Sequence, residues 1–135
     1  MAFYKSSEEF YAVIQKGFDQ LALDPKATAD FHKRHMVVDI RCTDPTVEIM
    51  LDGRTNPITT SFGPYAGKSD LKLELSTDLF NEILLGKASV KAAFTGGKVK
   101  VSGNIFRAMQ LRDLFYQISR LYPTILREMG YDVSS

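Results

Sequence analysis

The sequence of 135 residues has little of several features that mark whole classes of protein. Its single cysteine, Cys42, excludes an internal disulfide and a zinc site built from cysteines. No apolar run approaches the roughly 20 residues of a membrane-spanning helix, and no signal peptide opens the sequence. Basic residues outnumber acidic ones by 17 to 16, so the chain as a whole has no general attraction for nucleic acid. We therefore expect one soluble domain over residues 1–135, located in the cytoplasm.

The motifs of common catalytic sites are also missing. The sequence has no complete phosphate-binding loop, no dinucleotide-binding glycine motif and no nucleophile elbow. Gly96-Gly97-Lys98 matches a fragment of a phosphate loop, but paired glycines before a strand are more typical of a turn. His32 and His35 have a spacing that could serve a metal, but apart from Asp30 and Asp39 no acidic third ligand is indicated nearby, which favours a solvated helix end.

The one thiol also has a simpler interpretation. Cys42 alternates with Val38 and Ile40, which favours a small core residue over a nucleophile. Acidic residues are scattered singly, and no pair of them suggests an acid–base couple. We predict no catalytic residues, no metal site and no cofactor, so the chain is not expected to be an enzyme.

Hydrophobic periodicity predicts helices at both ends of the chain and strands in the middle. The first helix begins with the capping box Ser6-x-x-Glu9. The predicted helices cover about 6–21, 25–35, 77–86, 89–94 and 105–121, with a last turn or two from Pro123 to Gly130. The predicted strands cover about 38–42, 47–52, 58–62, 71–75 and 99–101. This order predicts an α+β fold with a mostly antiparallel sheet.

The C-terminal helical region is more apolar than one packed face requires. A helix that packs on one side needs three or four apolar residues per two turns. Residues 105–126 exceed this with Ile105, Phe106, Ala108, Met109, Leu111, Leu114, Phe115, Ile118, Leu121, Tyr122, Ile125 and Leu126. The excess is compatible with a filled core, a ligand cavity or a partner surface.

Charge is distributed unevenly along the chain. Residues 1–67 carry seven basic and nine acidic residues, whereas residues 68–135 carry ten basic and seven acidic ones. No acidic residue lies between Glu82 and Asp113, a segment that contains Lys87, Lys91, Lys98, Lys100, Arg107 and Arg112. Either this is a solvated face, or it contacts an anionic head group or an anionic membrane surface.

The stretch from Leu71 to Leu111 resembles the core of the sterol carrier protein 2 family. It reads LKLELSTDLFNEILLGKASVKAAFTGGKVKVSGNIFRAMQL. The matching features are the alternating strand, Asp78 and Phe80 opening a helix, Gly86-Lys87, Ala93-Phe94, Gly97-Lys98-x-Lys100, Gly103 and Ala108-Met109-x-Leu111. Their order and spacing carry the resemblance, which extends more weakly over about residues 5–118.

The resemblance implies a fold and a function. Family members have a five-stranded sheet covered on one face by helices, with a hydrophobic tunnel between the layers, and they bind and transfer fatty acids, fatty acyl-CoAs, sterols and phospholipids. Transferred to this sequence, the expected cavity wall is Phe80, Leu84, Phe94, Ile105, Met109, Leu114 and Ile118. The residues expected at the head group or an anionic membrane are Lys87, Lys91 and Arg107.

Two departures from the family pattern leave alternatives open. Ala88-Ser89 stands where many members have Asn-Pro, and residues 119–135 form a C-terminal extension that could narrow the tunnel mouth. The alternative function is an interaction or accessory domain, in which the apolar helix docks a partner or second copy, or presents acyl-CoA to an enzyme. A dimer interface containing Phe115 and Tyr122 would favour docking. The chain is compatible with a monomer or a weak homodimer.

Overall fold

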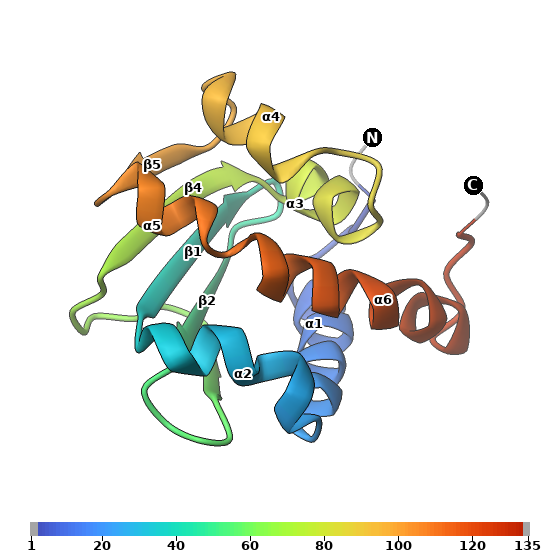
Figure 1. The fold of residues 1–135 in the computed structure, drawn as a ribbon. Helices are drawn as coiled ribbons and strands as arrows, with labels where there is room; N and C mark the ends of the chain where they lie inside the picture. The colour runs from blue at the N-terminus through green and yellow to red at the C-terminus, as the bar shows by residue number, and fades with distance from the viewer. Residues whose placement is uncertain (1–2, 134–135) are drawn as a thin grey trace.

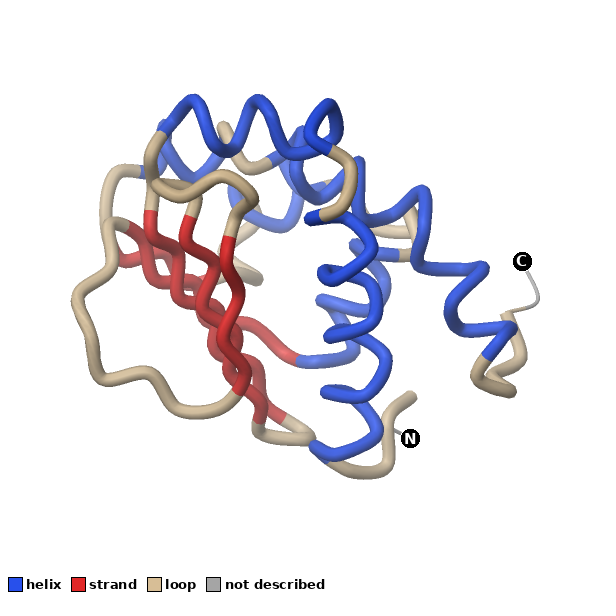
Figure 2. Tube along the Cα trace, turned by 90° about the horizontal axis from the view of Figure 1, so that it is seen from below, coloured by secondary structure: helices blue, strands red, loops and turns tan. Residues whose placement is uncertain are grey.

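The computed structural model describes residues 3–133 and has a five-stranded sheet with helices gathered on one side of it (Figure 1, Figure 2). The strands are β1 (Val37–Thr43), β2 (Val47–Asp52), β3 (Thr59–Phe62), β4 (Leu71–Ser76) and β5 (Lys100–Ser102). The helices are α1 (Ser7–Ala22), α2 (Pro25–Arg34), α3 (Thr77–Leu84), α4 (Val90–Thr95), α5 (Ile105–Met109) and α6 (Arg112–Glu128). The α+β class and the five-stranded sheet are confirmed.

The sheet has the order β3-β2-β1-β4-β5. Among the described strands, β1 pairs parallel with β4 and the other three pairings are antiparallel. The residues of β1 that face the helices are buried and lie level with buried leucines of β4: Val38 with Leu71, Ile40 with Leu73 and Cys42 with Leu75. The period of two in the sequence therefore places one apolar face against the helices.

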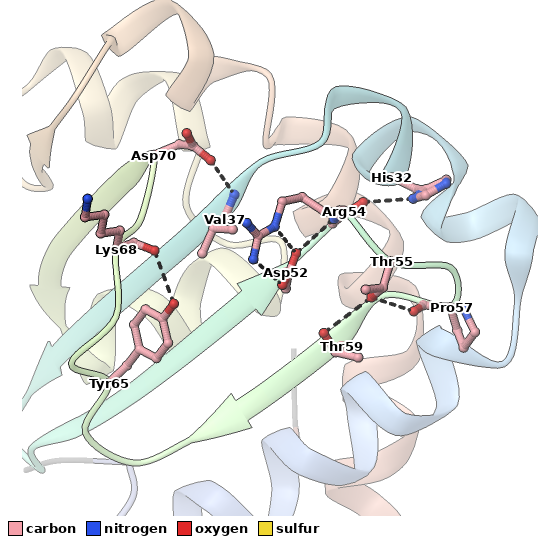
Figure 3. Close-up of polar contacts among 11 residues, drawn as sticks. His32, Val37, Asp52, Arg54, Thr55, Pro57, Thr59, Tyr65, Lys68 and Asp70 are labelled. Atoms are coloured by element: carbon pink, nitrogen blue, oxygen red, sulfur yellow. Dashed lines mark hydrogen bonds and ion pairs between the residues drawn. The ribbon is translucent and has the colours of Figure 1, made fainter.

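Because β3 and β4 point in the same direction, the chain must return along the sheet between them. Residues 63–70 make this return as a loop instead of a helix (Figure 3). Within it, the Tyr65 hydroxyl donates to the Lys68 carbonyl at 3.2 Å. Asp70 fixes the entry to β4, since the Val37 amide donates to its carboxylate at 2.8 Å and its own amide donates to the Val37 carbonyl at 2.8 Å.

Serine and aspartate side chains cap the first four helices, and the cap at Ser6 is the one that the capping box predicts. The side chains of Ser6, Asp24, Ser76 and Ser89 each accept a backbone N–H in the first turn that follows. After α3, Gly86 adopts a φ of +75°, which costs glycine little and other residues more. These local signals fix where the central helices begin and end.

The C-terminal helices differ from the prediction. Instead of one helix over 105–121, the chain breaks at Gln110–Leu111, where the Leu111 amide bonds to the Ala108 carbonyl at 3.1 Å and closes a tight turn. The turn redirects the chain so that Ala108 and Leu111 are both buried. Pro123 lies inside α6 and does not start a new segment, because burial of the surrounding apolar side chains outweighs one missing N–H.

Candidate functional site

The centre of the helical layer is built from α3 and α6. Four of the residues expected to line a cavity lie there, each almost fully buried in one apolar cluster: Phe80, Leu84, Leu114 and Ile118. The rings of Phe80 and Phe115 meet edge to face at 6.1 Å, which joins the two helices. The structure therefore brings these four side chains into one cluster where α3 and α6 pack together.

The remaining three expected wall residues are distributed differently. Phe94 of α4 is buried in the same cluster, and Met109 of α5 is partly buried against it. Ile105 is 42% exposed and lies at the surface end of α5. The family resemblance placed both Ile105 and Met109 in the cavity wall, but of the two only Met109 packs against the buried cluster.

The three expected head-group residues also separate into two groups. Lys87 and Lys91 are exposed on either side of the turn that enters α4. Arg107 is partly buried, and its Nη1 lies 3.8 Å from Asp70 Oδ1 at the start of β4. Arg107 therefore has a carboxylate partner, which reduces its availability to a ligand.

Open pockets surround α4 and the end of α3. One of about 490 Å³ is lined by α3, α4 and α6, and includes Ile83, Phe115 and Lys91. A second, of about 390 Å³, lies between α3 and the two chain ends and includes Asn81 and Lys87. The first pocket reaches two buried residues of the cluster, Ile83 and Phe115, and the second is lined by partly buried side chains that pack against it, such as Leu85.

A buried polar chain beside the apolar cluster was not predicted from the sequence. The hydroxyls of Tyr4 and Tyr122 are 2.5 Å apart, and the Tyr122 hydroxyl donates to Asn81 Oδ1. Burial raises the pKa of both tyrosine hydroxyls above the usual value, so they remain protonated. Helical spacing assigns Tyr122 to an apolar face, and nothing in the sequence indicates that its partner is residue 4.

The structure also shows the surroundings of Cys42, His32 and His35, the residues considered above as a nucleophile or as metal ligands. Burial raises the pKa of the Cys42 thiol to about 12, although a hydrogen bond from Thr77 opposes the shift. The His32 Nδ1–H donates a hydrogen bond to the Gly53 carbonyl at 2.8 Å (Figure 3). Its ring lies 5.3 Å from that of His35. Among residues 3–133, no group of three or more His, Cys, Asp or Glu side chains is arranged to hold a metal.

Within the described chain, no helix is long and apolar enough to cross a membrane.

Comparison with protein families gives a match to the SCP-2 sterol transfer family over residues 18–116. A curated relative, the fatty acid-binding protein of Yarrowia lipolytica (strain CLIB 122 / E 150), is 38% identical over 48 residues. This alignment spans 36% of the present chain and 37% of that protein, so it covers little more than a third of either. The family match confirms the resemblance carried by residues 71–111.

Two solved structures show how the fold is used. The apo form of sterol carrier protein 2 from Yarrowia lipolytica is 23% identical with a TM-score of 0.64, covering 84% of this chain and 91% of that chain. A stereoselective inverting sec-alkylsulfatase from Pseudomonas sp. is 22% identical with a TM-score of 0.53, covering 67% of this chain but 14% of that enzyme. The fold therefore occurs both as almost a whole protein and as a small part of a larger enzyme.

Proposed function

We propose that the chain, which belongs to the SCP-2 sterol transfer family, binds a lipid non-covalently between its helical layer and its sheet and carries it between membranes. The observation that carries this proposal is the family match over residues 18–116. The ligand would be a fatty acid, a fatty acyl-CoA, a sterol or an isoprenoid-like lipid, and the carrier would work in the cytoplasm without a chemical step.

The arrangement of apolar side chains supports this proposal. Phe80, Leu84, Leu114 and Ile118 would form the inner wall, with Phe94, Met109 and Ile105 continuing it toward the surface at α4 and α5. Each methylene of an acyl chain buried there would contribute about 0.8 kcal/mol. A chain of ordinary length would then bind without a covalent bond.

The polar part of the lipid would remain near α4. Lys87 and Lys91 are exposed beside pockets that adjoin the apolar cluster, so a carboxylate or phosphate could reach them while its hydrocarbon lies inside. Arg107 would contribute only if its contact with Asp70 opened. Both lysines would also meet the head groups of an anionic membrane during transfer.

The first prediction tests the proposed wall with Met109. We expect Met109→Trp to weaken binding of a fluorescent fatty-acid analogue by at least tenfold, because the indole would occupy space that an acyl chain needs. Its unfolding free energy without lipid should change by less than about 1 kcal/mol, since overpacking a filled core costs about 1–3 kcal/mol. Met50→Trp is the matched control, because Met50 lies on the sheet face away from the helices, level with Asp39, and should leave probe affinity unchanged.

Displacement titrations and thermal unfolding of both variants show whether Met109 lines a cavity or belongs to a filled core. If Met109→Trp is strongly destabilised while its folded fraction binds the probe normally, Met109 is core and the wall assignment is wrong. If acyl, sterol, isoprenoid and phospholipid probes all fail to bind the wild-type protein, lipid carriage itself is wrong.

The second candidate function is that of an accessory domain within a larger protein or complex. The occurrence of the same fold within a sec-alkylsulfatase favours it. If such a domain docked a partner through its apolar helix, Phe115 and Tyr122 would contact the partner. The structure instead buries both side chains inside the monomer. Any docking surface of this chain must therefore use other residues.

A further inference from the structure

A hollow of about 420 Å³ lies at the outer face of the sheet, the face turned away from the helices (Figure 2). Its size falls in the range of small-molecule sites, and none of the residues proposed to bind lipid lines it. We call it the outer hollow. Its lining residues come from α1, the β1–β2 hairpin, the loop after β3 and β4: Tyr11, Arg41, Cys42, Thr43, Thr46, Val47, Glu48, Pro64 and Glu74.

Three charged side chains form a row across the outer hollow. Arg41 of β1 is level with Glu48 of β2 and with Glu74 of β4. In each strand these residues alternate with buried ones that face the helices, so all three side chains point to the outer face. Arg41 therefore stands between two carboxylates.

The Arg41 guanidinium is held through one nitrogen only. Its Nε lies 3.2 Å from Glu48 Oε2 and 3.3 Å from Asp39 Oδ2. Among residues 3–133, its two terminal Nη groups donate no hydrogen bond to the protein. The side chain is 43% exposed, so a solute can reach it. The guanidinium is thus fixed in place while its Nη groups keep donors for a further acceptor.

Glu74 offers the opposite charge next to this guanidinium. Its side chain is 42% exposed, and its Oε2 lies 3.9 Å from Lys100 Nζ, which is beyond hydrogen-bond distance. The row of Arg41 and the adjacent row of Asp39 carry equal numbers of cations and carboxylates: Arg41, Lys72 and Lys100 against Asp39, Glu48 and Glu74. This balance favours neither a net anion nor a net cation, but it suits a molecule that has one charge of each sign.

The outer hollow also has an apolar side with a fixed position. The Tyr11 hydroxyl accepts the Glu48 N–H at 2.9 Å, and the Tyr11 ring meets that of Phe62 edge to face at 6.3 Å. Pro64 follows Gly63, whose N–H donates to the Glu48 carbonyl at 2.9 Å. The rings of Tyr11 and Pro64 are therefore both anchored to the backbone of Glu48, beside the charged row.

We propose that the outer hollow binds a free α-amino acid with an apolar side chain. The α-carboxylate accepts hydrogen bonds from the Nη groups of Arg41, the α-ammonium donates to Glu74, and the side chain packs against Tyr11. Arg41 and Glu74 occupy paired positions on neighbouring strands, which lie about 5 Å apart, so one small molecule reaches both. The site is separate from the apolar cluster of α3 and α6, so the proposal does not depend on lipid carriage.

The ligand is tested by removing its three groups one at a time. Isothermal titration calorimetry of the full chain compares L-phenylalanine with phenylpropionate, which lacks the ammonium, with phenethylamine, which lacks the carboxylate, and with glycine, which lacks the ring. We expect L-phenylalanine to bind and each of the other three to bind at least about tenfold more weakly, because each loses a hydrogen bond to a charged group or the burial of an apolar ring.

The site is tested with two pairs of variants. Glu74→Gln should weaken L-phenylalanine binding by at least about tenfold, because it removes the charged acceptor. Glu82→Gln is its control at an exposed position of α3 and should change binding by less than about twofold. Thr46→Trp should abolish binding by filling the outer hollow from an exposed position, whereas Thr59→Trp adds the same ring at an exposed position of β3 outside it. Thermal unfolding checks that each variant is folded.

Each outcome decides the proposal separately from lipid carriage. No binding of L-phenylalanine at millimolar concentration overturns it, as does equal binding of phenylpropionate or phenethylamine. Binding that Glu74→Gln and Thr46→Trp leave unchanged would place the amino acid elsewhere and also overturn it. Tighter binding of the zwitterion glycerophosphocholine would assign the hollow to a lipid head group instead. A normal displacement titration with a fatty-acid probe in these cases would leave the proposed function standing.

Discussion

Asp39 is the residue whose environment departs most from the ordinary pattern of a sheet surface. It lies on β1 facing away from the helices, yet it is 1% exposed. Its Oδ2 is 3.3 Å from Arg41 Nε, and within the described chain its Oδ1 has no hydrogen-bond partner. Burial, and then the hydrogen bond and charge of Glu48, raise the pKa of Asp39 to about 6. A buried carboxylate with one unpaired oxygen is costly when it is ionised.

This cost predicts a specific dependence of stability on pH. Between the ordinary pKa of 3.8 and the folded value of about 6, the folded state binds more protons than the unfolded state. The unfolding free energy of the wild type therefore falls as pH rises through this window. Asp39→Asn keeps a donor toward Glu48 without the charge, and we expect it to be more stable than the wild type by about 2 kcal/mol at pH 7.5.

Urea unfolding at pH 4 and pH 7.5 measures the effect, and the gain should nearly vanish at the lower pH. Asp52→Asn is the control with the opposite sign, because hydrogen bonds from Arg54 hold the pKa of Asp52 below its usual value. That variant should lose stability at pH 7.5. A gain for Asp39→Asn that is equal at both pH values would show that charge is not its cause.

At the scale of elements, the seam between α1 and α6 depends on one glycine. A Cβ on Gly17 would lie 3.1 Å from Ile118 Cδ1 and 3.6 Å from Ile125 Cδ1, so the two helices approach closely there. We expect Gly17→Val to lower the unfolding free energy by about 2 kcal/mol, since the added methyl groups have no space. Ala12→Val is the control on the exposed side of α1 and should cost less than about 1 kcal/mol. Equal losses would show that only helix propensity matters.

Another prediction at this scale concerns the hydrogen bond between Tyr122 of α6 and Asn81 of α3. Tyr122→Phe removes the hydroxyl that contacts both Asn81 and Tyr4, and it leaves a buried amide oxygen without this donor. We expect a loss of about 1–3 kcal/mol in unfolding free energy, the cost of an unpaired buried polar group. Tyr116→Phe, at a largely exposed position of the same helix, should change stability by less than about 0.5 kcal/mol. An unchanged Tyr122→Phe variant would contradict a structural role for the chain of hydroxyls.

These elements also show where sequence reasoning succeeds. Caps such as Ser76 and alternating runs such as Leu71–Ser76 are local, so their signals lie within a few neighbouring residues. The break at Gln110–Leu111 depends on burying Ala108 and Leu111 together, and the contact between Tyr4 and Tyr122 joins the two ends of the chain. Neither leaves a local pattern. Helical spacing likewise predicted which apolar residues of α3 and α6 are buried. It did not predict that Ile105 is exposed, because this depends on the break in the chain.

At the scale of the whole molecule, the end of α6 belongs to the core. The family match ends at residue 116, whereas α6 continues to Glu128. Beyond residue 119, Tyr122, Ile125 and Leu126 are buried in the same cluster as Phe80 and Leu84. A helix that only covered a cavity mouth would bury few side chains this completely. The C-terminal extension therefore stabilises the domain in addition to any effect on lipid entry.

This assignment predicts the result of shortening the chain. Removing residues 120–135 deletes three buried side chains, each worth about 1.5–3 kcal/mol, from a domain whose total stability is typically about 5–15 kcal/mol. We expect the shortened protein to lose its cooperative urea transition and to bind the dye ANS, as states with loosened packing do. Removing residues 132–135 instead leaves α6 and Tyr131 intact, and this control should unfold cooperatively. If the chain ending at residue 119 stayed cooperative and accepted bulkier lipid probes than the wild type, the end of α6 would be a lid over the cavity and not part of the core.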